Sequence, residues 1–120
     1  MRDDNDTTTA RGKRAEDQAA RFLEQRGLTV WHRNYRCPGG EIDLVCRDGG
    51  TLVFVEVRQR RDRRFGGAAA SITTTKQERI VRAAQHFLVA QKKTNSNCRI
   101  DCVLIDGDET TWLRNAISAD

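Results

Sequence analysis

Two acidic residues interrupt two apolar segments that surround a pair of glycines, and this arrangement limits what the chain can fold into. Residues 40–46 and 51–58 are each typical of a β-strand, and Gly49 and Gly50 between them are typical of a tight hairpin turn. Asp43 lies inside the first apolar segment and Glu56 inside the second. Because a buried carboxylate is costly unless something compensates it, the hairpin needs a reason to carry both.

The register of the hairpin follows from its turn. If Gly49 and Gly50 are the turn residues, Asp43 lies directly opposite Glu56. A turn one residue earlier makes the two acids diagonal neighbours on the same face, whereas a three-residue loop with a bulge breaks the relation. Like charges that face each other destabilise a sheet, so the sequence predicts a positive charge between them. A hard divalent cation suits paired carboxylates best, and the nearby Arg58 is the alternative.

Hydrophobic periodicity predicts two helices and three more strands around the hairpin. In chain order these are a helix from Thr9 to about Arg26, a strand at residues 28–33, a helix from Thr75 to about residues 92–93, a strand at residues 99–105 and a short strand around residues 111–113. Residues 34–40 and 59–71 are expected to be loops. The order α-β-β-β-α-β-β, with a parallel crossover after the hairpin, predicts an α/β fold in which helices flank a mixed sheet.

Length and composition bound the organisation of the chain. We expect residues 1–8 to be a disordered tail and residues 9–120 to form a single domain. The N-terminal residues are charged and no apolar segment is long enough to span a bilayer, so we expect a cytoplasmic protein that does not bind membranes. The four cysteines contain no C-x-x-C pair and are expected to be reduced thiols.

Basic residues are concentrated where the second hairpin strand ends. The net charge is +4, and Asp62 is the single acid among the arginines of residues 58–64. This distribution favours contact with phosphates, and a merely solvated loop is the alternative. Lys76 follows Thr75, the expected N-cap of the second helix, where free N–H groups attract anions; a plain surface lysine is the alternative. The candidate nucleic-acid-binding residues are Arg60, Arg61, Arg63, Arg64, Lys76 and Lys13.

Several segments together resemble the PD-(D/E)XK nuclease superfamily, and more closely the YraN-like family of predicted bacterial endonucleases. They are RGKRAE at residues 11–16, GEIDL at residues 40–44, FVEVRQR at residues 54–60, Phe65-Gly66, Lys76 with its helix, and RID at residues 99–101. The resemblance runs from about Arg11 to Ala116. The first of these segments, at residues 11–16, and the hairpin also resemble archaeal Holliday junction resolvases.

The resemblance implies a restriction-endonuclease-like fold and a phosphodiesterase site that uses Mg²⁺, with Mn²⁺ as a substitute. Asp43 and Glu56 would be the metal ligands, and Glu16 would add an acid from the first helix. Arg58 stands where the superfamily has a lysine, and Ile42 stands where it has a proline. An arginine stays protonated, so Arg58 cannot act as a base, but it can hold a phosphate or the charge that develops in the transition state.

Three hypotheses follow for the function. The first is a nuclease that selects DNA by structure, branched or single-stranded, since no helix is evident for reading the major groove. The second is a non-catalytic nucleic-acid-binding module that acts with a DNA-processing partner. The third is an ordinary sheet in which Glu41–Arg58 and similar pairs are only cross-strand ion pairs. Resolvase-like relatives work as dimers, so a homodimer is an expectation that comes with the resemblance.

Overall fold

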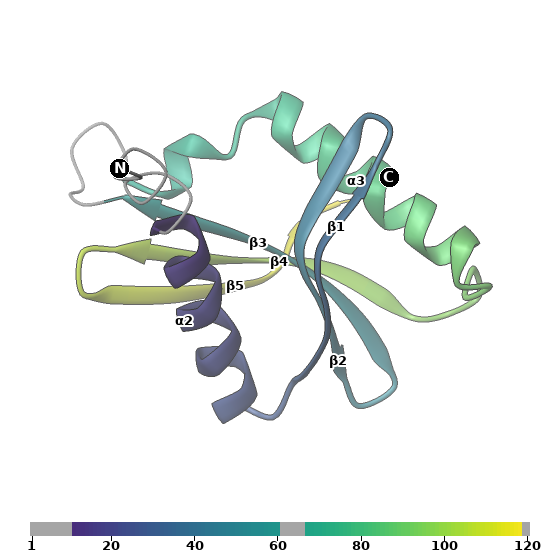
Figure 1. Cartoon of the computed structure of the whole chain (residues 1–120), viewed down its shortest axis with the longest axis horizontal. Helices are drawn as coiled ribbons and strands as arrows, with labels where there is room; N and C mark the ends of the chain where they lie inside the picture. Colours follow the sequence, from purple (N-terminus) through teal and green to yellow (C-terminus); the bar gives the residue numbers. More distant parts are fainter. Residues whose placement is uncertain (1–10, 61–66, 119–120) are drawn as a thin grey trace, which may run out of the picture.

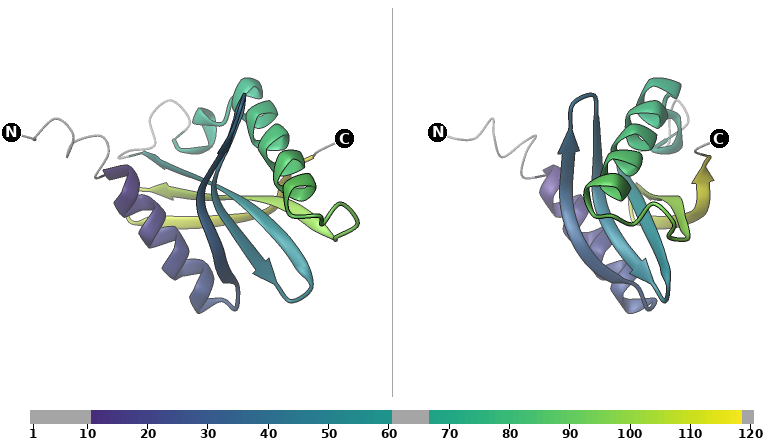
Figure 2. Two further views of the ribbon diagram at one scale, coloured as in Figure 1. Left: turned by 45° about the vertical axis from the view of Figure 1, so that its right-hand side comes forward. Right: turned by 90° about the vertical axis from the view of Figure 1, so that its right-hand side faces the viewer.

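A five-stranded mixed sheet with one helix against each face makes up the structure (Figures 1 and 2). The computed structural model describes residues 11–60 and 67–118. Its elements are α2 (Arg11–Gln25), β1 (Thr29–Cys37), β2 (Gly40–Asp48), β3 (Thr51–Arg60), the 3₁₀-helix η3 (Ala69–Ser71), α3 (Thr74–Ala90), β4 (Cys98–Asp106) and β5 (Glu109–Ile117). The strands lie in chain order, and only β3 and β4 run parallel. The predicted α/β fold and element order are confirmed, whereas the prediction for residues 1–8 lies outside the described residues.

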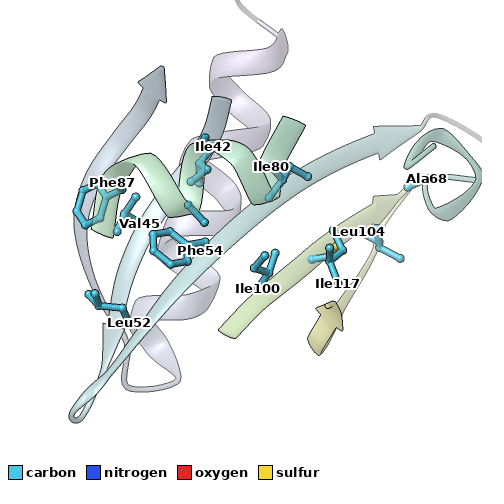
Figure 3. Close-up of a cluster of buried hydrophobic side chains, with 13 residues drawn as sticks. Ile42, Val45, Leu52, Phe54, Ala68, Ile80, Phe87, Ile100, Leu104 and Ile117 are labelled. Atoms are coloured by element: carbon cyan, nitrogen blue, oxygen red, sulfur yellow. The ribbon is translucent and has the colours of Figure 1, made fainter. Parts of the chain in front are cut away.

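Strand β3 is buried on both faces and so forms the centre of the core. Val53, Phe54 and Val55 are all fully buried. Odd-numbered side chains of β3 pack with α2, whereas Phe54 packs with α3, where its ring lies 5.7 Å from the ring of Phe87 (Figure 3). Because the crossover helix α3 and helix α2 cover opposite faces, neither face of this strand needs polar residues at residues 52–55, which explains their apolar sequence.

Strand β2 separates from β3 before either strand ends. The last recorded pair between them is Leu44 with Val55. Beyond it, β3 continues along β4 as far as Arg60, and β2 continues along β1 as far as Gly40. Helix α3 packs against the diverging end of β2, where a Cβ at Gly40 would lie 2.4 Å from a backbone oxygen of α3. A glycine is therefore required at position 40 for this close approach.

The first strand is longer than predicted. Residues 34–40 were expected to be a loop, but β1 extends to Cys37 and pairs Tyr35 with Ile42. Asn34 has a positive φ of 56°, a conformation that asparagine adopts more readily than most residues. The sequence interpretation was wrong because asparagine is common in turns. Asn34 interrupts the strand only locally, but in the sequence it looks like the start of a loop.

The start of α3 also differs from the prediction. Thr73 is the N-cap instead of Thr75, and its hydroxyl accepts a hydrogen bond from the backbone N–H of Lys76 at 3.2 Å. Three consecutive threonines offer equivalent caps, so the capping-box pattern was two residues out of place. Strand β3 likewise extends to Arg60, where a loop was expected from residue 59.

All four cysteines are free thiols, as expected. Cys46 and Cys102 are buried, whereas Cys98 is exposed at the start of β4. In the two described ranges, no helix combines the length and apolar character needed to cross a membrane.

Candidate active site

Asp43 and Glu56 meet at the point where β2 leaves β3. The predicted register is confirmed, because Asp48 pairs with Thr51 across the glycine turn. If the pairing continued one residue beyond Leu44 and Val55, Asp43 would lie opposite Glu56. There the backbone N–H of Val57 donates to Oδ2 of Asp43 at 2.8 Å, so a side chain replaces the backbone acceptor. The carboxyl groups of Asp43 and Glu56 are also hydrogen-bonded to each other.

Burial makes this pair of carboxyl groups unusual. Glu56 is only 6% exposed. Its burial, followed by the charge of Asp43, raises the pKa of Glu56 to about 8. Burial also raises the pKa of Asp43, against the opposing hydrogen bonds from Val57 and Glu56. Two carboxyl groups this close cannot both ionise easily, so the pair tends to keep one shared proton.

Arg58 lies on the same face as Glu56 and is held in place from both sides. Its Nη1 donates to Oε2 of Glu56 at 3.1 Å, and its Nε donates to the Ser71 hydroxyl at 2.9 Å. That hydroxyl donates in turn to the backbone oxygen of Ala68 at 2.7 Å. The sequence predicted that either a cation or Arg58 provides positive charge beside the two acids. Arg58 does so for Glu56.

The cross-strand pair between Glu41 and Arg58 does not form. Glu41 lies 3.9 Å from the guanidinium of Arg36 instead, and both side chains are largely exposed. The reason is that β2 has already left β3 before it reaches Glu41. This prediction from register alone was wrong.

Helix α2 brings a third carboxyl group towards Asp43. Burial and the charge of Asp43 raise the pKa of Glu16, whereas a hydrogen bond from Asn34 lowers it. Nδ2 of Asn34 donates to Oε1 of Glu16 at 3.2 Å. Asn34 occupies the β1 position opposite Asp43, between the pairs that Leu44 and Ile42 form with β1. Its backbone at this position is left-handed.

Sequence reasoning missed two of these residues. Asn34 was assigned to a loop. The one indication of its role in the site was that a polar asparagine follows directly after the predicted strand. Ser71 gave no indication at all, because its contact with Arg58 depends on how the chain returns after residues 61–66. Both side chains support a charged residue of the candidate site without belonging to a recognisable motif.

The basic candidates are brought together only in part. Lys76 lies in the first turn of α3, and its charge lowers the pKa of Glu56. Lys13 is exposed on α2, one turn before Glu16, and Arg60 is exposed at the end of β3. The other three predicted contacts lie outside the described residues; they are Arg61, Arg63 and Arg64.

The donor set at the carboxyl pair suits a small, hard cation. Across residues 11–60 and 67–118, no cluster of three or more His, Cys, Asp or Glu side chains is arranged to hold a metal ion. Mg²⁺, however, commonly binds through one or two carboxylates and keeps several of its waters. Asp43 and Glu56 supply two such groups, and the proton they share marks a place where a cation would relieve their repulsion. The residues therefore fit Mg²⁺.

Comparison with known proteins places this chain in a family. The model of "Uncharacterised protein family UPF0102" matches residues 15–105, a range that includes Glu16, Asp43, Glu56 and Arg58. A UPF0102 protein of Dechloromonas aromatica (strain RCB) is 63% identical over 116 residues, which cover 97% of this chain and 95% of the relative. A UPF0102 protein of Ralstonia pickettii (strain 12J) is 54% identical over 117 residues, or 94% of each chain. The chain therefore belongs to the UPF0102 family, the YraN-like family that its motifs resemble.

Proposed function

We propose that this protein is a Mg²⁺-dependent endonuclease that hydrolyses phosphodiester bonds of DNA. The observation that carries the proposal is the pair of carboxyl groups formed by the buried Glu56 and the half-buried Asp43, at the point where β2 separates from β3. A fold stabilised only by packing gains nothing from two acids there, since burial, followed by the charge of Asp43, raises the pKa of Glu56 to about 8. A bound cation would turn this unfavourable pair into a binding site.

Each acidic residue has a distinct role in this proposal. Asp43 and Glu56 would hold Mg²⁺, which supplies a bound water of lowered pKa and polarises the phosphate when present. Glu16, whose pKa is raised by its burial and by the charge of Asp43, would accept a proton from the attacking water. Because Arg58 stays protonated, its role is to bind a non-bridging phosphate oxygen and stabilise charge in the transition state.

Basic side chains beside this site would hold the sugar–phosphate backbone. Lys76 is close enough to influence Glu56, and it stands at a helix N-terminus where backbone N–H groups favour anions. Lys13 and Arg60 extend the positive surface on either side, continued by the arginines of residues 61–64 in sequence. Contacts of this kind recognise the shape of DNA more than its sequence, which favours branched or single-stranded substrates.

A second candidate function is a nucleic-acid-binding module without catalysis, recruited by a DNA-processing partner. The observation that favours it is the ion pair between Arg58 and Glu56 at 3.1 Å. A guanidinium in that position already balances one carboxylate and competes with a metal ion for it. In this case, the acidic pair would position Arg58 for binding phosphate.

Cleavage assays separate the two functions. Branched, flapped, single-stranded and duplex DNAs are incubated with Mn²⁺ or Mg²⁺, and the wild type is compared with Glu56→Gln. The control is Glu78→Gln, which removes an exposed carboxylate from α3. The nuclease proposal predicts metal-dependent cleavage that Glu56→Gln abolishes and Glu78→Gln retains. Salt-sensitive binding without cleavage by any variant would contradict the nuclease and support the binding module.

A further inference from the structure

Two cations share one indole ring at the end of the sheet away from the carboxyl pair. Cζ of Arg47 lies 4.5 Å from the ring centroid of Trp31, and Nζ of Lys93 lies 5.7 Å from it. The indole is itself fixed edge-on against Phe87 of α3, with ring centroids 5.5 Å apart. A strand residue and a residue just after α3 are therefore held near each other by one anchored aromatic ring.

Arg47 and Lys93 line a pocket of about 100 Å³ between the β2–β3 turn and the loop after α3. Figure 2 shows this turn and this loop at the same end of the sheet. Its volume is several times the roughly 10–15 Å³ that a single water requires, so the pocket accepts a group larger than water. The other lining residues are Gly49, Gly50, Thr51, Leu52 and Ser96.

The positive charge in this pocket is not neutralised by the described residues. Asp48 is the acid beside Arg47 in sequence, but its Oδ2 is paired with Nη2 of Arg99 at 3.0 Å. Within residues 11–60 and 67–118, neither Arg47 nor Lys93 takes part in an ion pair. Both cations line the same pocket, so a ligand that accepts hydrogen bonds from both would be favoured there.

We propose that this pocket binds a phosphate group of a nucleic-acid backbone, at a site distinct from the carboxyl pair. The guanidinium of Arg47 can donate two parallel hydrogen bonds to phosphate oxygens, and Lys93 adds a compact charge. Leu52 at the pocket and Glu56 are four residues apart on β3, or about 13 Å along the strand.

That the pocket binds a phosphate is inferred from Arg47 and Lys93 alone. That this phosphate belongs to a nucleic acid rests on the proposed function. Free inorganic phosphate has the same oxygen acceptors and is the competing source. A backbone phosphate is favoured because the Arg47 side chain is exposed and the pocket is open, which leaves room for the chain on both sides of the bound group.

A charge-matched pair of double variants tests the proposal. Arg47→Gln with Lys93→Gln removes the two pocket cations. The control, Arg26→Gln with Arg114→Gln, removes two cations that also lie over aromatic rings, 3.5 Å from the centroid of Phe22 and 4.2 Å from that of Trp112. Both double variants lose the same charge, and neither control residue lines the pocket.

Fluorescence anisotropy with a labelled single-stranded oligonucleotide, in EDTA and at several salt concentrations, gives the readout. We expect weaker binding for the pocket variant and a plot of log affinity against log salt that is shallower by about 0.7, the value for one phosphate contact. The control should keep the wild-type slope. Equal losses in the two variants would overturn the proposal, because the effect would then be one of net charge.

Two further arms identify the ligand and separate this proposal from the nuclease. If inorganic phosphate raises the melting temperature of the wild type as much as an oligonucleotide with the same phosphate concentration, the nucleic-acid assignment is overturned. The Mn²⁺-induced change in melting temperature reports the carboxyl pair alone. If the pocket variant alone loses oligonucleotide binding, the phosphate-pocket proposal is supported even if Mn²⁺ does not change the melting temperature. If Mn²⁺ changes the melting temperature but the pocket variant binds the oligonucleotide no more weakly than the control does, only the phosphate-pocket proposal is overturned.

Discussion

Replacing Glu56 by glutamine should change how the stability of this protein depends on pH. The variant keeps the size of the side chain and an oxygen acceptor for Arg58, but it removes the titrating group. In the folded protein, the pKa of Glu56 is raised from 4.5 to about 8 by burial and by the charge of Asp43. Between these two pH values, the folded state holds a proton that the unfolded state has released. The contribution of Glu56 to the free energy of unfolding therefore falls as pH rises from 4.5 to about 8.

The size of the effect follows from the same pKa values. The free energy of unfolding should fall by at most about 1.4 kcal/mol per pH unit, and by up to about 5 kcal/mol across the window. A loss of this size is a large fraction of the roughly 5–15 kcal/mol that stabilises a typical domain. Because Glu56→Gln lacks this loss, its stability relative to the wild type should increase steadily from pH 5.5 to pH 8.

Urea denaturation at a series of pH values, in buffers with EDTA, measures this difference directly. Glu78→Gln is the control, since it removes an exposed carboxylate and should differ from the wild type by a constant amount. Saturating Mg²⁺ should flatten the wild-type curve, because a bound cation replaces the shared proton. A difference between the wild type and Glu56→Gln that does not change with pH would refute the reasoning.

Three other predictions test the surroundings of the site. Gly40→Ala should destabilise the fold by about 1–3 kcal/mol in urea denaturation, because its Cβ would lie 2.4 Å from a backbone oxygen of α3; Gly50→Ala, with no atom within 4 Å of its Cβ, should have little effect, and equal losses would contradict the packing described. Asp101→Asn should cost about 3–5 kcal/mol in the same assay, since it removes the charge of a fully buried carboxylate that pairs with the partly exposed Arg99; a change below 1 kcal/mol would show that the pair is dispensable. Asn34→Asp should raise the pKa of Glu16 further, measured by NMR titration of the side-chain carboxyl carbon, because a hydrogen-bond donor becomes a second negative charge; an unchanged pKa would place Asn34 away from Glu16 in solution.

The part of the site that the sequence predicts depends on a single local feature. The Gly49-Gly50 turn fixes the register, and the register brings Asp43 and Glu56 together. Apolar residues on both faces of the strand, at residues 52–55, likewise identify β3 as central. Turn chemistry and residue alternation act over a few residues, so they can be recognised without knowledge of the rest of the fold.

The features that escaped prediction depend on contacts between distant segments. Whether Glu41 or Glu56 pairs with Arg58 is decided by where β2 leaves β3, and α3 packs closely against the diverging end of β2 at Gly40. Ser71 reaches Arg58 only because the chain returns to the sheet after residue 66. No pattern along the sequence encodes these two outcomes.

The central claim is that two neighbouring carboxylates form a cation site, and a Mn²⁺ titration followed by isothermal calorimetry tests it most directly. The wild type, Asp43→Asn, Glu56→Gln and Glu78→Gln are titrated at pH 7 without DNA. We predict one binding site in the wild type and in Glu78→Gln, with proton release because Glu56 must ionise to bind the metal, and no binding in the other two variants. An absence of binding in the wild type, or equal binding in all four proteins, would contradict the account.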